Sequence, residues 1–310
     1  MDTKELQVRQ RWTLNQKIDH SLYVIESFIS HFGGGVYVSF SGGKDSTVLL
    51  DLCRRVKPDV MAVFCNTGNE FPDIVQFVRG KVAGGENVRI IRPAMNPRMV
   101  IEKYGFPIHS KELARKIYYA RKKSPWAVNC LNKANSKYAL KPKFQYLMKT
   151  RYDISDFCCR ELKKNPFARF EKETGLHPII GTMAGESLMR QTQYIRRGGG
   201  NTFENGKIES TPLAIWTESD VWQYIRENDI KIADIYAKGA KRTGCMFCGY
   251  GCHLANEKNR FRLILDIYPK WYYHFMEYQN NGVTYREALR DILKVNNMYL
   301  PDEDPNLKLF

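Results

Sequence analysis

The stretch VYVSFSGGKDSTVLL, residues 36–50, has the residue types and spacing of a phosphate-binding turn. Residues 36–40 form a β-branched and aromatic run that predicts a buried parallel strand, and residues 46–56 have the apolar spacing of a helix. The glycines between them let the backbone turn tightly, so that N–H groups and the helix N-terminus converge where an anion would sit. An ordinary glycine-rich turn is the alternative. The serines, Lys44 and Asp45 crowded into the same stretch favour phosphate binding.

This turn is not the common P-loop, G-x-x-x-x-G-K-[ST], because Val38 replaces the first glycine and Asp45 follows the lysine. The order S-G-G-K-D-S resembles instead the pyrophosphate loop of the ATP pyrophosphatase superfamily. Its members cleave ATP between the α and β phosphates, adenylate an oxygen and let a nucleophile displace AMP. The resemblance implies ATP and Mg²⁺ as ligands, with Asp45 as a catalytic residue that acts through Mg²⁺. The nucleotide-binding residues that it implies here are Ser39, Ser41, Gly42, Gly43, Lys44, Asp45 and Ser46.

Five of the eight cysteines are grouped: FCCREL contains Cys158 and Cys159, and TGCMFCGYGCH contains Cys245, Cys248 and Cys252. A C-x-x-C with a third cysteine four residues later, among glycines, is typical of a soft-metal half-site and alone indicates zinc. The adjacent pair followed far downstream by C-x-x-C resembles the four ligands of the [4Fe–4S] cluster in assimilatory adenylylsulfate reductases. That resemblance implies Cys158, Cys159, Cys245 and Cys248 as ligands, with zinc or no metal as the alternatives.

The fifth clustered cysteine, Cys252, has no fixed role in this pattern. It could carry sulfur near the cluster, or it could replace Cys158 or Cys159 as a ligand, and the sequence leaves these alternatives open. The remaining cysteines are predicted to be ordinary packing residues, namely Cys53, Cys65 and Cys130.

The elements that must position these residues alternate along the chain. Strands are predicted at 36–40, 60–65, 88–92, 177–182 and 210–216, with helical stretches between them and an amphipathic helix at 14–32 before them. This alternation implies right-handed crossovers and a doubly wound, mainly parallel α/β sheet with ligands at the carboxyl ends of the strands.

Two further motifs follow predicted strands, NTGNEFPD at 66–73 and GTMAGESLMRQ at 181–191, and TPLAIWTESDVWQYI covers 211–225. With the loop they resemble the phosphoadenosine phosphosulfate reductase family over about residues 36–250. The resemblance implies an adenine nucleotide alpha hydrolase-like fold. The positions that it carries over are Thr67 and Gly68 beside the nucleotide, and Glu186 and Arg190 lining its pocket.

The chain departs from the family pattern at two of these motifs, so an unchanged substrate is not implied. Asn66 replaces the acid of the family, and Met183 stands where an arginine is usual. In the third motif the tryptophans at 216 and 222 are predicted to be core residues. Asp220 is predicted to be structural, because it lies three residues after Thr217 and completes a pattern close to a capping box.

Sulfonucleotide reductases attack the substrate sulfur with a cysteine in an E-C-G-[IL]-H tail, and no cysteine follows Cys252 here. Either Cys252 has taken that catalytic role or the chemistry differs. Without the tail, the chain is similar to DNA phosphorothioation sulfur-transfer proteins and to cluster-bearing tRNA thiolation enzymes. In both, adenylation activates an oxygen and sulfur displaces AMP. A cysteine desulfurase or another sulfur donor would then be a partner.

The predicted domains are an N-terminal helical segment at 1–33, a nucleotide-binding α/β domain at 34–230 with a basic insert at 106–157, and a cysteine-rich loop with a helical region at 231–310. The formal net charge is +15, and residues 111–151 contain a single acid, Glu112, among many lysines and arginines with interleaved aromatics. Such a segment can follow a DNA or tRNA backbone and stack bases. A solvated basic face or a docking surface for an acidic protein is the alternative.

The composition, 43% hydrophobic and 26% charged over 310 residues, is typical of a soluble globular chain. The polar N-terminus and the lack of a long apolar run predict a cytoplasmic protein without a membrane partner. We therefore predict an enzyme that uses MgATP to adenylate an oxygen, on nucleic acid, for iron–sulfur-assisted sulfur transfer. The alternatives are a sulfonucleotide reductase using Cys252 and a non-catalytic nucleotide-sensing or partner-binding module.

Overall fold

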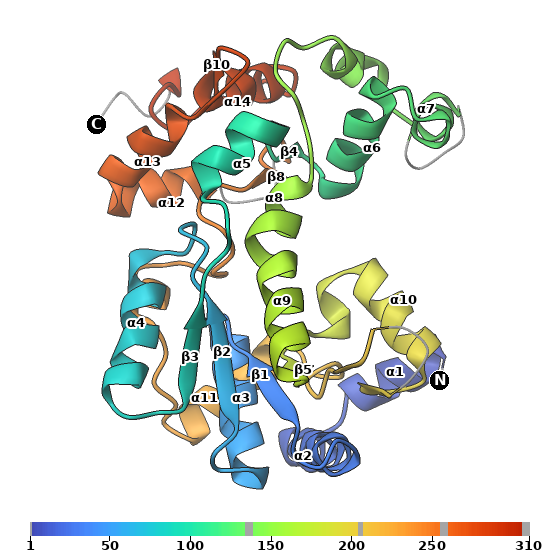
Figure 1. Cartoon of the computed structure of the whole chain (residues 1–310), viewed down its shortest axis with the longest axis vertical. Coiled ribbons are helices and arrows are strands. Elements are labelled where there is room, and N and C mark those ends of the chain that lie inside the picture. The colour runs from blue at the N-terminus through green and yellow to red at the C-terminus, as the bar shows by residue number, and fades with distance from the viewer. Residues whose placement is uncertain (1, 134–138, 204–206, 255–259, 306–310) are drawn as a thin grey trace. The chain divides into compact units, whose positions relative to one another are not determined.

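The computed structural model describes residues 2–133, 139–203, 207–254 and 260–305. The chain forms two compact units, each assembled from three segments (Figure 1). Unit 1 comprises 1–66, 72–91 and 167–237, and unit 2 comprises 67–71, 92–166 and 238–310. No helix among the described residues is long and apolar enough to cross a bilayer.

Unit 1 is built on a mainly parallel sheet. Within the described residues its six strands run in the order β3-β2-β1-β5-β7-β6, and β6 alone pairs antiparallel, with β7. The strands are β1 (Val36–Ser39), β2 (Met61–Cys65), β3 (Val88–Ile91), β5 (His177–Ile180), β6 (Asn201–Thr202) and β7 (Glu209–Ser210). The helices are α1 (Thr3–Gln10), α2 (Leu14–His31), α3 (Lys44–Val56), α4 (Pro72–Ala83), α9 (Asn165–Thr174), η3 (Ala184–Glu186), α10 (Leu188–Arg197), α11 (Glu218–Glu227) and η4 (Asp234–Tyr236). The predicted doubly wound α/β fold is confirmed.

Helices cover both faces of this sheet, which explains why β1 reads as a continuous apolar run. Figure 1 shows α9 in front of the sheet and α3 behind it. On the α9 side, the ring of Tyr37 packs edge-on against Phe170, with ring centroids 5.0 Å apart. Val48 and Leu49, on the apolar face of α3, are fully buried. The strand order reverses between β1 and β5, and this switch point is where open α/β sheets place ligands.

The predicted strand at 210–216 is wrong beyond its first residue. β7 ends at Ser210, because Pro212 has no N–H to donate to a ladder and its carbonyl accepts from the Ser21 hydroxyl, 2.9 Å away. The chain then turns inward, and the Trp216 indole N–H donates to the same hydroxyl at 2.9 Å. Trp216 is fully buried, which confirms its predicted core position, whereas Trp222 is half-buried.

The capping box at α11 is confirmed and is part of a buried ion pair. The Thr217 N–H donates to Asp220 Oδ2 at 2.6 Å, and the Asp220 N–H donates to Thr217 Oγ1 at 3.4 Å. The same carboxylate oxygen accepts from Lys17 Nζ at 2.6 Å. The Lys17 side chain is only 2% exposed, so Asp220 neutralises a charge that water does not reach.

Replacing Asp220 with Asn should lower the free energy of unfolding by about 3 kcal/mol, because Lys17 keeps its buried charge without a partner. Urea unfolding followed by circular dichroism measures this loss. The control is Glu5→Gln, which breaks the exposed Arg9–Glu5 pair and should cost under about 0.5 kcal/mol. Equal, small losses for both variants would contradict the structural role of Asp220.

Unit 2 is mainly helical and contains the five clustered cysteines and the basic insert. Its short strands are β4 (Ile108–His109), β8 (Gly249–Tyr250), β9 (Gln279–Asn280) and β10 (Val283–Thr284), which pair as β4 with β8 and β9 with β10. Its helices are α5 (Pro97–Tyr104), α6 (Lys111–Arg121), α7 (Pro125–Asn132), η1 (Pro142–Met148), α8 (Phe157–Cys159), η2 (Arg160–Lys164), α12 (Arg260–Ile267), α13 (Pro269–Met276) and α14 (Tyr285–Lys294). The three predicted domain ranges remain a prediction.

Candidate active site

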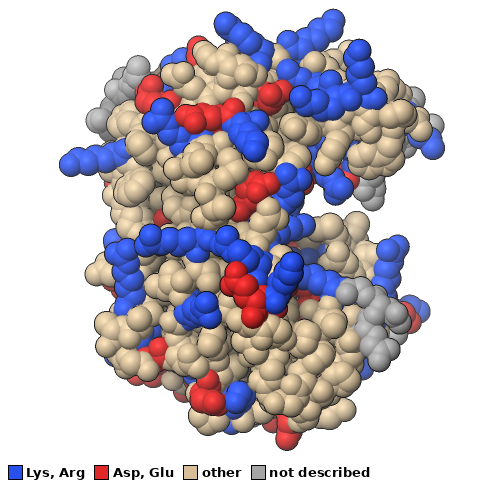
Figure 2. All heavy atoms as spheres, viewed as in Figure 1, with Lys and Arg blue, Asp and Glu red and all other residues tan. Residues whose placement is uncertain are grey.

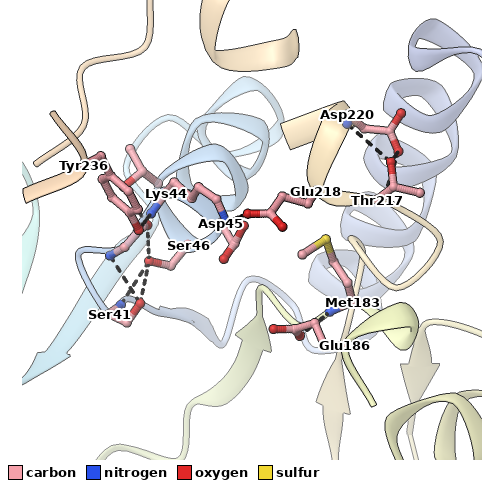
Figure 3. Close-up of polar contacts among 12 residues, drawn as sticks. Ser41, Lys44, Asp45, Ser46, Met183, Glu186, Thr217, Glu218, Asp220 and Tyr236 are labelled. Carbon is pink, nitrogen blue, oxygen red and sulfur yellow. Dashed lines mark hydrogen bonds and ion pairs between the residues drawn. The ribbon is translucent and has the colours of Figure 1, made fainter. Parts of the chain in front are cut away.

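The predicted phosphate loop connects β1 to α3 at the carboxyl end of the sheet. The Ser46 hydroxyl lies 3.0 Å from the Ser41 hydroxyl, accepts from the Ser41 N–H at 3.1 Å and donates to the Gly43 carbonyl at 2.9 Å (Figure 3). The Gly43 N–H donates in turn to Ser41 Oγ at 3.3 Å. The two serines therefore fix the loop, with Ser41 exposed at its tip and Ser39 half-buried at the end of β1.

Glycine is required at two positions around this loop for different reasons. Gly42 has φ +72°, and a Cβ there would lie 2.8 Å from the Ile74 side chain on α4. Gly181, which follows β5, would place a Cβ 3.2 Å from the Asp45 carbonyl oxygen. The loops after β1 and β5 thus approach each other closely, as the sheet's switch point requires.

Lys44 is buried and paired with two carboxylates. Its ammonium lies 3.0 Å from Asp45 Oδ1 and 3.5 Å from Glu218 Oε1, and its side chain is 3% exposed. The backbone N–H of Lys44 donates to the Tyr236 hydroxyl at 2.7 Å, so a side chain already satisfies one amide of the loop (Figure 3). Sequence reasoning missed Glu218 and Tyr236, because both come from elements distant in the chain.

Two of the other predicted pocket residues are brought together in unit 1. Glu186 accepts from the Met183 N–H at 3.0 Å and forms an ion pair with Arg190 one helical turn later. Thr67 and Gly68 belong instead to unit 2. There Thr67 is held by Glu70, to which its N–H and hydroxyl donate at 2.9 and 2.7 Å.

Four of the clustered cysteines line one cavity in unit 2. Its thiol lining is Cys158, Cys159, Cys245 and Cys248, which are the four predicted metal ligands. Apolar side chains such as Phe247 and Phe275, stacked with ring centroids 3.3 Å apart, form much of the remaining wall. Asn69 also lines the cavity, and its buried Oδ1 has no hydrogen-bond partner among the described residues.

The thiols of this cavity lie close enough to influence one another. Burial, followed by the nearby Cys245, raises the pKa of Cys158 well above its ordinary value, and the same two causes raise that of Cys248. Lys163, one helical turn after Cys159, donates to the Cys245 sulfur, and its interaction with Cys245 raises the pKa of the lysine above its ordinary value. The guanidinium of Arg260 donates to the backbone carbonyls of Cys245 and Cys248 at 3.3 and 3.2 Å, and so fixes the loop that carries these two cysteines.

Soft metals prefer thiolate ligands, so the four cysteines of this cavity could hold a soft-metal centre. No three His, Cys, Asp or Glu side chains among the described residues converge closely enough to hold a single ion. The four thiols line one cavity, and thiolates are ligands both of zinc and of iron–sulfur clusters. Sequence reasoning missed Lys163 and Arg260, although the i, i+4 spacing of Cys159 and Lys163 is visible in the sequence.

Cys252 does not line the four-cysteine cavity. Burial raises its pKa to about 12. Of the three cysteines predicted to be packing residues, Cys53 and Cys65 are buried as expected, whereas Cys130 is half-exposed.

Some of the cations in the basic insert make structural contacts within the protein. Arg121 donates to the carbonyls of Thr150 and Tyr152, each at 2.7 Å, and Lys116 is 1% exposed and paired with Glu112. These cations hold the segment together. Lys111, Arg115 and Lys122 are exposed.

Comparison with known proteins gives a family match. The phosphoadenosine phosphosulfate reductase domain matches residues 35–250. An uncharacterized protein of Methanocaldococcus jannaschii is 26% identical over 76% of this chain and 45% of that protein, so the chain spans less than half of this relative. The adenosine 5′-phosphosulfate reductase of Halalkalibacterium halodurans is 22% identical, covering 76% of this chain and 84% of the relative. The phosphoadenosine 5′-phosphosulfate reductase of Gloeobacter violaceus is 25% identical, covering 72% and 74%.

Two solved structures are similar at low identity. A phosphoadenylyl-sulfate reductase from Candida auris aligns with a TM-score of 0.46 and 18% identity, covering 79% of this chain and 96% of that one. A U34-tRNA thiolase from Methanococcus maripaludis, solved with its [4Fe-4S] cluster, aligns with a TM-score of 0.37 and 12% identity, covering 84% and 77%.

Proposed function

Because this chain belongs to the phosphoadenosine phosphosulfate reductase domain family, we propose that it is an ATP-dependent sulfurtransferase that acts on nucleic acid. It would use MgATP to adenylate an acceptor oxygen, and sulfur would then displace AMP. One observation carries the proposal: the same chain has a serine-glycine loop before α3 and a cavity lined by four cysteines. A module that only bound a nucleotide would need the loop and not the cysteines.

The loop residues can serve the first step. The acceptor oxygen attacks the α-phosphorus of ATP, a new O–P bond forms, and the bond to the β-phosphate breaks as pyrophosphate leaves with its electron pair. The hydroxyls of Ser41 and Ser46 and the N-terminus of α3 can hold the departing pyrophosphate. Asp45, in the first turn of α3 and partly exposed, can bind the Mg²⁺ that accompanies it.

The cysteines can serve the second step. Sulfide attacks the adenylated centre, the bond from that centre to oxygen breaks, and AMP leaves with the electron pair of that bond. Cys158, Cys159, Cys245 and Cys248 would hold a [4Fe–4S] cluster, and such a cluster, when bound, supplies a place to hold the sulfur. Lys163 donates a hydrogen bond to the Cys245 sulfur, and the apolar wall limits access of water.

The experiment that tests this proposal identifies the products. Protein purified without oxygen is incubated with MgATP, a sulfide or persulfide donor, and DNA or tRNA. We expect AMP and pyrophosphate in equal amounts and sulfur in the nucleic acid. Release of ADP and phosphate would contradict the pyrophosphatase assignment.

A sulfonucleotide reductase that uses Cys252 is the second candidate, favoured by the names of two relatives. The raised pKa of Cys252 counts against a nucleophilic role for this thiol. Formation of sulfite from adenylylsulfate, or from its 3′-phosphorylated form, would establish the reductase instead.

A further inference from the structure

A second cavity of unit 2, of about 200 Å³, has a strongly cationic wall. Lys111, Arg115 and Tyr119 line it from successive turns of one face of α6, because residues four apart on a helix share a face. Arg160 and Lys164 line it from η2. The only acid in this wall is Asp156. Figure 2 shows Lys and Arg side chains gathered over the part of unit 2 that contains α6.

The cations of this wall are available to a ligand. Among the described residues, Lys111, Arg115 and Lys164 form no ion pair with a carboxylate, and all three are exposed. Arg160 differs, because it pairs with Glu161 and its guanidinium lies 3.7 Å from the centre of the Phe157 ring. Asp156 offsets part of this positive charge, and a bound anion would reduce the remaining repulsion between the cations.

This cavity and the four-cysteine cavity share one residue, Cys159. Lys111 and Cys159 line the same cavity. An anion held by Lys111 and its neighbours would therefore lie beside the cysteines. This adjacency distinguishes the cavity from an ordinary solvated basic surface, because an acceptor must bind next to the site of sulfur transfer.

We propose that this cavity binds a backbone phosphate of a single-stranded segment of nucleic acid and thereby brings the strand to the cysteine site. The inference rests on the proposed function and names the residues that would recognise its acceptor. Guanidinium and ammonium groups are the usual partners of phosphate oxygens, and Tyr119 offers a half-buried ring for contact with a base or sugar. Single-stranded segments suit the cavity because their flexible backbone can enter a concave site.

The test measures the affinity of the whole protein for a fluorescent single-stranded oligonucleotide, as RNA and as DNA, by anisotropy at increasing salt. In the triple variant Lys111→Ala, Arg115→Ala, Lys164→Ala, we expect affinity at low salt to fall at least about tenfold. The slope of log K against log salt should become shallower by roughly 0.7 for each phosphate that the cavity holds. These side chains are exposed, so the variant should keep the wild-type melting temperature.

The matched control removes the same charge from exposed residues of the basic insert that do not line the cavity, in the variant Lys122→Ala, Lys133→Ala, Lys149→Ala. It should keep most of the affinity. An equal loss in both variants, or no loss in the first, would overturn the inference while leaving the proposed function standing. Wild-type protein that binds no oligonucleotide would refute the nucleic-acid acceptor itself. Inorganic phosphate is the third probe. If phosphate at millimolar concentration displaces the oligonucleotide, the result supports a phosphate site in the cavity. If the protein binds phosphate to saturation but binds no oligonucleotide, the assignment of the cavity to a nucleic-acid strand is overturned.

Discussion

Replacing Asp45 with Asn is expected to lower the rate of pyrophosphate release from MgATP by at least about 100-fold, because a carboxylate that holds Mg²⁺ supplies several kcal/mol of transition-state stabilisation. Binding of ATP should survive in large part. The serine hydroxyls and the N-terminus of α3 do not depend on this carboxylate, and Lys44 keeps its second partner, Glu218. Rapid-quench measurement of pyrophosphate, together with equilibrium binding of ATP, separates the two effects.

The control for this prediction is Asp51→Asn. Asp51 is a partly exposed carboxylate farther along α3, where it pairs with Arg55 and accepts from the Tyr224 hydroxyl. It should leave turnover unchanged. A wild-type rate in the Asp45 variant would refute the role of this carboxylate in binding the metal.

Replacing Cys245 with Ser is expected to abolish the iron content of anaerobically purified protein, which should be about four atoms per chain in the wild type. A serine hydroxyl is a hard ligand that stays protonated at neutral pH, so it does not replace a thiolate on iron. Iron and sulfide analysis with the visible absorption spectrum measures the loss.

Cys130→Ser is the matched control, because Cys130 lies in the same unit, is half-exposed and does not line the cysteine cavity. It should retain the brown colour. Colourless wild-type protein that carries about one zinc per chain and accepts no cluster on reconstitution would contradict the prediction.

The elements whose signals are local could be predicted from the sequence. The β-branched run of β1, the glycines after it and the helical spacing of α3 lie within one short stretch, and the structure has all three. The capping box of α11 is equally local, since Thr217 and Asp220 are three residues apart. Its buried partner Lys17 was missed, because that contact joins residues far apart in the chain.

The sequence was a poor guide where contacts between distant parts of the chain determine the structure. Residues 211–216 have the composition of a strand, but hydrogen bonds to Ser21 turn the chain inward instead. In the basic insert, charge alone did not distinguish Arg121, which closes a loop through backbone carbonyls, from Lys111, which faces a cavity. Aromatic residues of the insert divide in the same way: Tyr118 packs on Phe157 with ring centroids 4.7 Å apart, whereas Trp126 is 52% exposed.

The assembly of each unit from three separated segments has a consequence for biosynthesis. Cys158 and Cys159 leave the ribosome well before Cys245 and Cys248, by roughly 4–17 s at about 5–20 residues per second. During that interval unit 2 lacks the segment that begins at residue 238, so the first two thiols have no cavity to enter. A metal centre held by all four cysteines could therefore form only after translation has passed the second pair. Until then the adjacent thiols of the nascent chain are open to oxidation unless the surroundings are reducing.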